Sequence, residues 1–289
     1  MQYEGQICRP PMERASYMLP VAVGCSYNAC TFCTLFKHLS YRQLPREQIE
    51  QELQRVVDAG GNPKTVFLGD GNAFGLDMDH LLWILNRVHH YFPGCEAVNM
   101  DATVTNIREK SDEALCLLAD AGVRNLYLGI ESGLDDVLRF MRKDHDTAQA
   151  EMQIRRMQEA GLVYCAHIMT GIAGKGRGME NADATAAFLN RTKPARVINF
   201  SIFHHKRAPL YRCIEDASYI PADEQENLRE EHRLLTLLDV DGLHYDGFHD
   251  ALELRFRGVL PRDKETLLAR AEHAIEYWQE QPSRLAVFP

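Results

Sequence analysis

Short apolar runs alternate with longer segments of helical periodicity from residue 18 to residue 205. Such runs, bounded by glycine and polar residues, are typical of strands buried in a parallel sheet. Between them apolar residues recur at helical spacing, as Ile49, Leu53 and Val56 do. The predicted strands are residues 18–23, 65–68, 96–100, 125–130, 162–169 and 197–203, and the predicted helices are residues 45–60, 81–90, 111–122, 134–142, 147–160 and a segment after Asn181.

This alternation predicts parallel strands joined by crossover helices. About six strand–helix units are expected, which is too few for a closed barrel of eight. We therefore predict an α/β fold, a partial (β/α)6 TIM-like barrel, over residues 1–205.

The pattern changes after Pro209. Loops are expected around Gly242, Gly247 and Gly258, because glycine weakens strand and helix interiors. We predict that residues 206–289 form a mainly helical C-terminal extension that covers the barrel mouth. Its expected helices are residues 222–238 and 263–279.

The net charge of −9 changes the expected class of partner. A protein held to nucleic acid by phosphate contacts usually carries a basic face, so this balance argues against nucleic acid. A small molecule or a peptide is favoured. No apolar run is long enough to predict a membrane span. Residues 1–5 lack the pattern of a secretory signal, and a cytoplasmic protein is expected.

Three of the eight cysteines, Cys25, Cys30 and Cys33, lie within nine residues directly after the first predicted strand. Three thiolates on one loop can each bind one iron of a [4Fe–4S] cluster, which leaves the fourth iron open to a ligand. A zinc site is the main alternative, with His38 as a fourth ligand. Coincidental clustering is a further alternative.

The cysteine loop resembles that of the radical S-adenosylmethionine (SAM) superfamily. The common signature of that superfamily is C-x3-C-x2-C with an aromatic residue before the last cysteine, and here Phe32 precedes Cys33. Four residues separate Cys25 from Cys30, a spacing similar to that of proteins resembling the Elongator catalytic subunit. The resemblance implies a [4Fe–4S] cluster and SAM as cofactors.

Motifs at the ends of the next two predicted strands extend the resemblance. The segment Gly69, Asp70, Gly71 and Asn72 stands where the superfamily binds the amino group of SAM. Asp70 replaces the usual small residue there, so the backbone carbonyls and Asn72 are the candidates. A plain turn is the alternative reading. The resemblance also implies contacts of Asp101 and Thr103 with ribose or substrate.

Two later motifs resemble those of oxygen-independent coproporphyrinogen oxidase and the methylthiotransferases. The resemblance implies that Glu131 binds the ribose hydroxyls, and that Lys143 or Arg142 meets the SAM carboxylate. The segment with Met169, Gly171 and Ile172 resembles the fifth strand of these proteins and the turn after it, which implies that these residues bind the cofactor, with Ile172 near the adenine.

The resemblance also implies a reaction. An external electron donor of the flavodoxin or ferredoxin type reduces the cluster, SAM is cleaved to a 5′-deoxyadenosyl radical, and the radical takes hydrogen from a substrate. The sequence does not identify the substrate. A haem chaperone and a tRNA-modifying enzyme are the alternatives. The candidate substrate-facing residues are His167, His204, His205, Tyr245 and His249.

Overall fold

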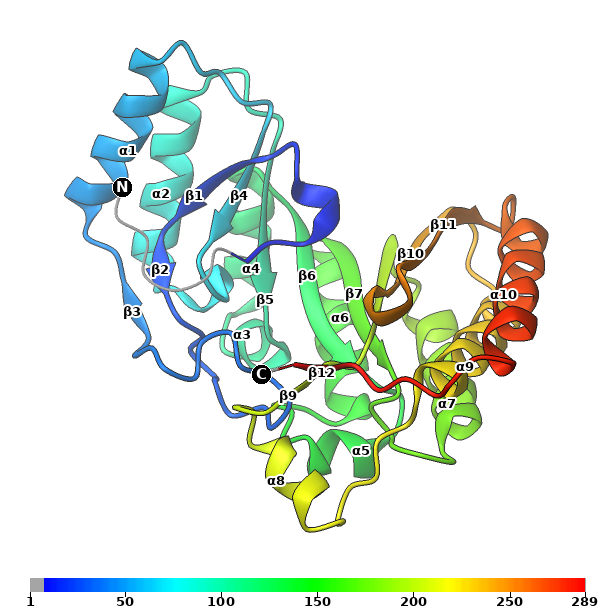
Figure 1. The fold of residues 1–289 in the computed structure, drawn as a ribbon. Helices are drawn as coiled ribbons and strands as arrows, with labels where there is room; N and C mark the ends of the chain where they lie inside the picture. The colour runs from blue at the N-terminus through cyan, green and yellow to red at the C-terminus, as the bar shows by residue number, and fades with distance from the viewer. Residues whose placement is uncertain (1–7, 289) are drawn as a thin grey trace. The chain divides into compact units, whose positions relative to one another are not determined.

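Eight strands form the main sheet of the described residues in the order β1-β4-β5-β6-β7-β8-β10-β11 (Figure 1). The structure is a computed structural model and describes residues 8–288. The strands of this sheet are β1 (Tyr17–Pro20), β4 (Thr65–Gly69), β5 (Ala97–Ala102), β6 (Val123–Glu131), β7 (Val163–Thr170), β8 (Arg196–Ser201), β10 (Leu243–His249) and β11 (Leu254–Leu260).

Helices follow most of the parallel strands in the chain, as the alternating pattern predicts. The α-helices are α1 (Arg46–Asp58), α2 (Met78–Tyr91), α3 (Val104–Arg108), α4 (Asp112–Asp120), α5 (Asp135–Phe140), α6 (Thr147–Glu159), α7 (Gly178–Thr192), α8 (Leu210–Glu215), α9 (Glu224–Leu237) and α10 (Lys264–Gln279). The 3-10 turns are η1 (Pro11–Glu13), η2 (Ala73–Gly75) and η3 (Asp250–Leu252). The short strands are β2 (Ala22–Val23), β3 (Arg42–Gln43), β9 (His204–His205) and β12 (Val287–Phe288).

The chain divides into two compact units. The first comprises the chain up to Asn28 together with residues 35–128 and 153–164. Within it β1 pairs with β4, β4 with β5, and β5 with β6, all in parallel. Its core is made of fully buried strand residues such as Leu19, Val66 and Leu68.

The second unit comprises residues 29–34, 129–152 and the chain from Cys165 onward. Within it β7 and β10 each pair in parallel with β8. The last strand, β11, pairs with β10 in the antiparallel direction. Strand β12 pairs with β9, so the end of the chain lies beside the segment that follows β8.

The prediction of loops between residues 242 and 260 is wrong, because β10 and β11 occupy most of that stretch. Gly247 and Gly258 lie inside these strands. A Cβ atom at Gly247 would collide with the Glu231 carboxylate, and one at Gly258 would crowd Asp263. These glycines do not form turns; they allow Glu231 of α9 and Asp263, the N-cap of α10, to approach the sheet closely.

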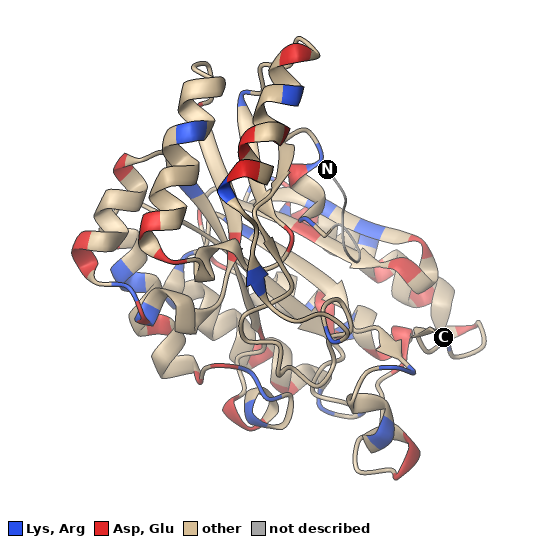
Figure 2. Cartoon of the chain, turned by 90° about the vertical axis from the view of Figure 1, so that its left-hand side faces the viewer, with Lys and Arg blue, Asp and Glu red and all other residues tan. Residues whose placement is uncertain are grey.

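The six predicted strands and the α/β class are confirmed, although the first predicted strand divides into β1 and β2. The division of the chain at residue 205 stays a prediction. The two compact units of the structure have other boundaries. Residues 1–5, which bear on export, lie outside the described residues. Among those described, no helix is both long and apolar enough to cross a bilayer. Figure 2 shows acidic and basic residues mixed along the helices.

Candidate functional site

The loop after β2 carries Cys25, the first of the three clustered cysteines. The backbone N–H of Asn28 donates to Cys25 Sγ over 3.5 Å. Asn28 has a positive φ of 46°, and its side chain donates to the Phe36 carbonyl over 2.8 Å. Asparagine tolerates this left-handed conformation better than most residues. The loop therefore presents a backbone N–H to the sulfur, the type of hydrogen bond that tunes iron–sulfur centres.

Asn72 holds this loop from the end of β4. Its Oδ1 accepts from the Ser26 N–H over 2.8 Å, and its Nδ2 donates to Ser26 Oγ over 2.8 Å. The same Nδ2 donates to Asn106 Oδ1 over 2.7 Å. Asn72 was predicted as one candidate for the SAM amino group, and this stays a prediction. In the structure its amide is bonded within the protein and supports the cysteine loop.

The carbonyls of the Gly69–Gly71 turn also have backbone partners. Gly69 accepts from the N–H of Val21, and Asp70 from the N–H of Gly24 over 3.1 Å. Gly71 has a positive φ of 140°, and a Cβ atom there would collide with the Gly24 carbonyl. Each carbonyl keeps a second lone pair for another donor. Burial raises the pKa of Asp70 to about 6, while a backbone hydrogen bond from Cys8 acts in the opposite direction.

Asp101 lies near the end of β5 and Thr103 directly follows that strand, and the two residues differ in environment. Thr103 is the N-cap of α3, and its hydroxyl accepts from the Asn106 N–H over 3.1 Å. Burial first, and then the Glu13 carboxylate, raise the pKa of Asp101 to about 8. Sequence reasoning missed Glu13, which accepts hydrogen bonds from Asn99 Nδ2 over 2.9 Å and Tyr127 Oη over 2.5 Å. No motif marks it, because its partners come from distant strands.

In the second unit, the segment with Cys30 and Cys33 is fixed through the residues between them. The Thr31 N–H donates to the Met141 carbonyl over 3.0 Å, and the Thr31 carbonyl accepts from the Leu210 N–H over 2.9 Å. Phe32 and Met169 pack against the apolar cluster that contains buried Ile172. The structure therefore brings three predicted cofactor contacts into one cluster.

Glu131 and Lys143 form a buried ion pair in the same unit. The Lys143 Nζ lies 3.1 Å from Glu131 Oε1, and the two side chains are 7% and 8% exposed. Glu131 has a positive φ of 66°, a conformation that costs energy for a residue other than glycine. A Cβ atom at Gly129 would collide with the Glu131 carboxylate. Burial alone would lower the pKa of Lys143, but the charges of Glu131 and Cys30 outweigh it and raise that pKa.

Gly171, at the end of β7, is held from both sides. Its N–H donates to Glu230 Oε2 over 2.8 Å, and its carbonyl accepts from Tyr219 Oη over 2.8 Å. Its φ of 79° is in the region that favours glycine, and a Cβ atom would crowd Asn227. The Glu230 carboxylate also accepts from Asn181 Nδ2 over 2.6 Å. Sequence reasoning missed Glu230 because it lies 59 residues after Gly171 in the chain.

Tyr245 and His249 were expected in loops over the barrel mouth, and this expectation is wrong. Both are on β10 and fully buried. His249 lies between Glu231 Oε2, at 2.6 Å, and Glu224 Oε2, at 2.9 Å. Tyr245 Oη donates to Glu231 Oε1 over 2.6 Å. They belong to a buried polar layer between the sheet and α9.

The other candidate histidines differ in exposure. His167, on β7, is half-buried. Within residues 166–170 only His167 and Met169 are half-buried, so their side chains share one face of the strand, as the alternation predicts. His204 is buried on β9, and its Nδ1 has no hydrogen-bond partner among the described residues. His205 is half-buried, with its ring 5.5 Å from that of Phe288.

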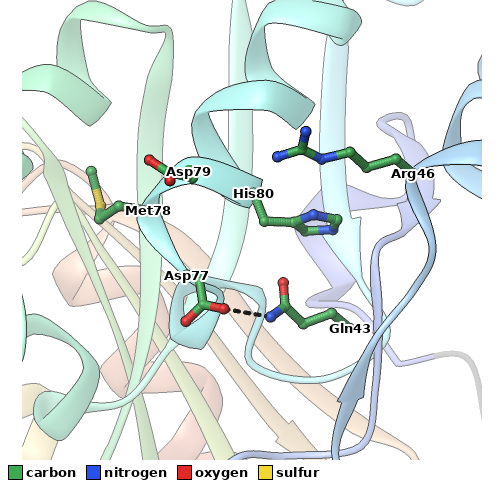
Figure 3. Close-up of a pocket in the computed structure, with 6 residues that line it drawn as sticks. All are labelled: Gln43, Arg46, Asp77, Met78, Asp79 and His80. Atoms are coloured by element: carbon green, nitrogen blue, oxygen red, sulfur yellow. Dashed lines mark hydrogen bonds between the residues drawn. The ribbon is translucent and has the colours of Figure 1, made fainter.

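A surface pocket of about 550 Å³ lies in the first unit, apart from every predicted site residue (Figure 3). Gln43 donates to Asp77 over 2.7 Å across it. Burial first, then Asp77 and Cys25, raise the pKa of the nearby Tyr41 to about 12. The pocket is lined by Gln43, Arg46, Asp77, Met78, Asp79 and His80.

The donor set suits an iron–sulfur cluster. All eight cysteines are thiols and not disulfides, and the three clustered ones are half-buried. Thiolate sulfur is the usual protein ligand of such clusters. Among the described residues no three His, Cys, Asp or Glu side chains already converge as a metal site. The assignment of the three cysteines to one cluster therefore rests on their spacing and chemistry.

The family model of the radical SAM superfamily matches residues 19–186. This match covers more than half of the chain and includes the cysteine loop, Glu131, Lys143 and Gly171. The chain belongs to the radical SAM superfamily. Members of this family use a [4Fe–4S] cluster and SAM.

The haem chaperone HemW of Bacillus subtilis is 23% identical over 223 residues, which are 74% of this chain and 58% of HemW. The threonylcarbamoyladenosine tRNA methylthiotransferase MtaB of the same organism is 24% identical over 78% of this chain and 50% of its own length. The chain thus spans about half the length of the curated relatives it matches.

Two solved structures resemble the fold. Coproporphyrinogen III oxidase (HemN) from Escherichia coli matches with a TM-score of 0.57 and 17% identity, over 76% of this chain and 52% of HemN. Archaeal Elp3 from Methanocaldococcus infernus matches with a TM-score of 0.57 and 12% identity, over 94% of this chain and 65% of that one. At these identities the likeness concerns the fold alone.

Proposed function

We propose that the protein is a radical SAM enzyme acting on a small-molecule or peptide substrate. The observation that carries this is the loop of Cys25, Cys30 and Cys33 within the matched family region. When bound, the cluster and SAM supply reductive cleavage: one electron from an external flavodoxin- or ferredoxin-type donor gives methionine and a 5′-deoxyadenosyl radical that abstracts hydrogen. Such thiolate chemistry fits a reducing compartment, so we place the protein in the cytoplasm.

The residues of the chain position the reactants in this proposal. The three cysteines bind three irons, and the Gly69–Gly71 carbonyls accept from the SAM amino group. Lys143 is charged, so its ammonium pairs with the SAM carboxylate, while Glu131 accepts from the ribose hydroxyls. Phe32 and Ile172, which share one apolar cluster, pack against the adenine and exclude water.

The test is anaerobic reconstitution of the whole chain with iron and sulfide, followed by dithionite and SAM. We expect four irons per chain and the release of 5′-deoxyadenosine, measured by liquid chromatography. The variant Cys30→Ala should lose both, and Cys116→Ala, at an exposed cysteine outside the loop, should keep both. Four irons with no cleavage of SAM would contradict the proposal.

A haem-binding relative is the second candidate, because HemW is described as a haem chaperone. His204 offers a ring nitrogen without a partner among the described residues. Tight haem binding that His204→Ala abolishes, together with no SAM cleavage, would favour this candidate.

A tRNA-modifying enzyme is the third candidate, because the similar protein MtaB is a tRNA methylthiotransferase. The net charge of −9 speaks against it. RNA binding that weakens steeply with salt would support it instead.

A further inference from the structure

The sheet of the second unit has polar residues on its fully buried face. Asn199 and Ser201 of β8 are buried there, as is His249 of β10. Helix α9 packs on this face, since Ser201 Oγ donates to Glu224 and His249 contacts Glu231. Polar groups usually face water and apolar groups face the core. Here the buried face is rich in polar residues, and the opposite face of the same strands differs from it in composition.

That opposite face carries three half-buried rings, His167, Phe200 and Phe248, which we call the aromatic ladder. The His167 and Phe200 ring centroids are 6.0 Å apart with planes at 6°. Phe200 and Phe248 are register partners on β8 and β10, with centroids 5.0 Å apart and planes at 21°. Aromatic rings that remain accessible on a sheet face indicate a binding surface.

One end of the ladder carries two guanidinium groups, Arg255 and Arg257 of β11, which we call the arginine pair. Arg255 lies over the Phe248 ring at 4.6 Å and donates twice to Asp246, over 2.7 and 2.6 Å. Arg257 lies 3.9 Å from the same carboxylate, and its side chain is 71% exposed. One carboxylate cannot neutralise two guanidinium groups, so this end of the ladder is positive in a chain of net charge −9.

The other end of the ladder is His167, which is on the same face of β7 as Met169, and Met169 packs against the apolar cluster assigned above to the adenine. Burial and then the Lys143 charge lower the pKa of His167 to about 4, so its imidazole is neutral at pH 7. Lys143 in turn pairs with Glu131 over 3.1 Å. The ladder therefore runs from the Met169 side of β7 to the arginine pair on β11.

We propose that the aromatic ladder and the arginine pair bind the substrate, a small molecule with a planar aromatic group and a carboxylate. The inference rests on the proposed function and names the substrate class of the same site. The aromatic group packs on the ring edges of the ladder, and the carboxylate meets the arginine pair. This orientation leaves the other end of the substrate near His167, on the Met169 side of β7.

Three probes separate the two halves of this recognition. Indole-3-acetate has a ring and a carboxylate, tryptophol has the ring alone, and cyclohexylacetate has the carboxylate alone. Each is titrated into the reconstituted full chain with SAM but without reductant, by isothermal titration calorimetry. We expect indole-3-acetate to bind about tenfold more tightly than either other probe. Equal affinities, or no binding of any probe, would overturn the proposal.

Matched variants test the named residues. Arg257→Gln and Phe248→Leu should each weaken indole-3-acetate binding about tenfold. Because Arg257 is exposed, its substitution leaves the fold intact. The control is Arg270→Gln, since Arg270 lies over the ring of Phe256, on the opposite face of β11, at 5.7 Å. This control should bind like the unaltered chain, and a loss as large as that of Arg257→Gln would overturn the proposal.

Failure here and failure of the proposed function are distinguishable. The titrations need no electron transfer, whereas the formation of 5′-deoxyadenosine does. Formation of 5′-deoxyadenosine without recognition of aromatic acids would refute this inference and leave the proposed function standing. Recognition without formation of 5′-deoxyadenosine would refute the proposed function alone.

Discussion

Lys143 and Arg142 are adjacent in the sequence, but the structure gives them different environments. Lys143 pairs with Glu131 and is nearly buried, whereas Arg142 is exposed. From the sequence, both residues were candidate partners of the SAM carboxylate. The choice depends on the end of α5, where Arg142 takes a positive φ of 52°. This geometry favours Lys143 as the SAM contact.

Substitution of Lys143 tests this assignment. Lys143→Met should weaken SAM binding roughly 10–100-fold, the value of one charged hydrogen bond. It should also cost about 3–5 kcal/mol of stability, because Glu131 loses its partner in a buried place. SAM affinity of the reconstituted protein is measured by equilibrium dialysis, and stability by thermal unfolding.

Two further variants separate binding from folding. The double variant Glu131→Gln/Lys143→Met removes both charges, so it should regain most of the stability but not the SAM affinity. Arg142→Gln is the exposed control and should change neither quantity. Unchanged SAM affinity in Lys143→Met would show that another residue binds the carboxylate.

Among single residues, the sequence was informative about type and position but not about partners. Cys25, Glu131 and Gly171 belong to motifs that can be recognised by spacing. Asn72 and Thr103 stand in such motifs as well, yet their side chains bond to Ser26 and to the Asn106 N–H. Short polar side chains at strand ends serve ligands and backbone equally well, and only tertiary contacts distinguish the two.

At the scale of elements, the six main strands and the longer helices up to residue 205 followed from apolar periodicity, whereas the short elements α3 and β3 were not predicted. Strands β10 and β11 did not, because Gly247 and Gly258 resemble turn residues. Helix α9 was predicted as a charged helix, and the structure buries Glu224, Glu230 and Glu231 of that helix. Carboxylates are almost never fully buried unless paired, and His249, the partner of Glu224 and Glu231, comes from a strand that was not predicted.

The buried contacts between α9 and β10 predict that stability falls as pH rises. Burial lowers the pKa of His249, but Glu231 and Glu224 outweigh it and raise that pKa to about 9. Burial raises the pKa of Glu230 to about 8. Both folded-state values exceed the ordinary values, so the folded chain binds more protons than the unfolded chain in this range.

The contribution of His249 is therefore complete below about pH 6.5 and is lost as pH rises through about 9. That of Glu230 is lost as pH rises through about 8. We expect the unfolding temperature to decrease steadily from pH 6.5 to pH 9. The variant Glu230→Gln should flatten this slope, and a flat profile in the unaltered chain would contradict the pKa assignments.

For the whole molecule, cluster binding should stabilise the fold. A group that binds the folded chain alone raises the unfolding temperature by mass action. The reconstituted chain should therefore unfold at a higher temperature than the iron-free chain in anaerobic calorimetry. Cys33→Ala should lose this difference, while Cys116→Ala, at an exposed position on α4, should keep it. Equal unfolding temperatures with and without iron would contradict the cluster assignment.

The superfamily was recognisable from the whole chain because several motifs occur in one order. The substrate was not, since its proposed site combines half-buried rings from β7, β8 and β10 with arginines from β11. No short motif records such a surface. The surface is formed by the register of neighbouring strands, and two of these strands, β10 and β11, were not predicted from the sequence.

The pairing of His249 with Glu224 and Glu231 has a consequence for how this part of the chain folds. If α9 or β10 were buried without the other element, a charged side chain would lie away from water without its partner. The two elements should therefore form and open as one cooperative unit. Native-state hydrogen exchange should report the same opening free energy for amides of α9 and β10, and His249→Ala should lower it in both together.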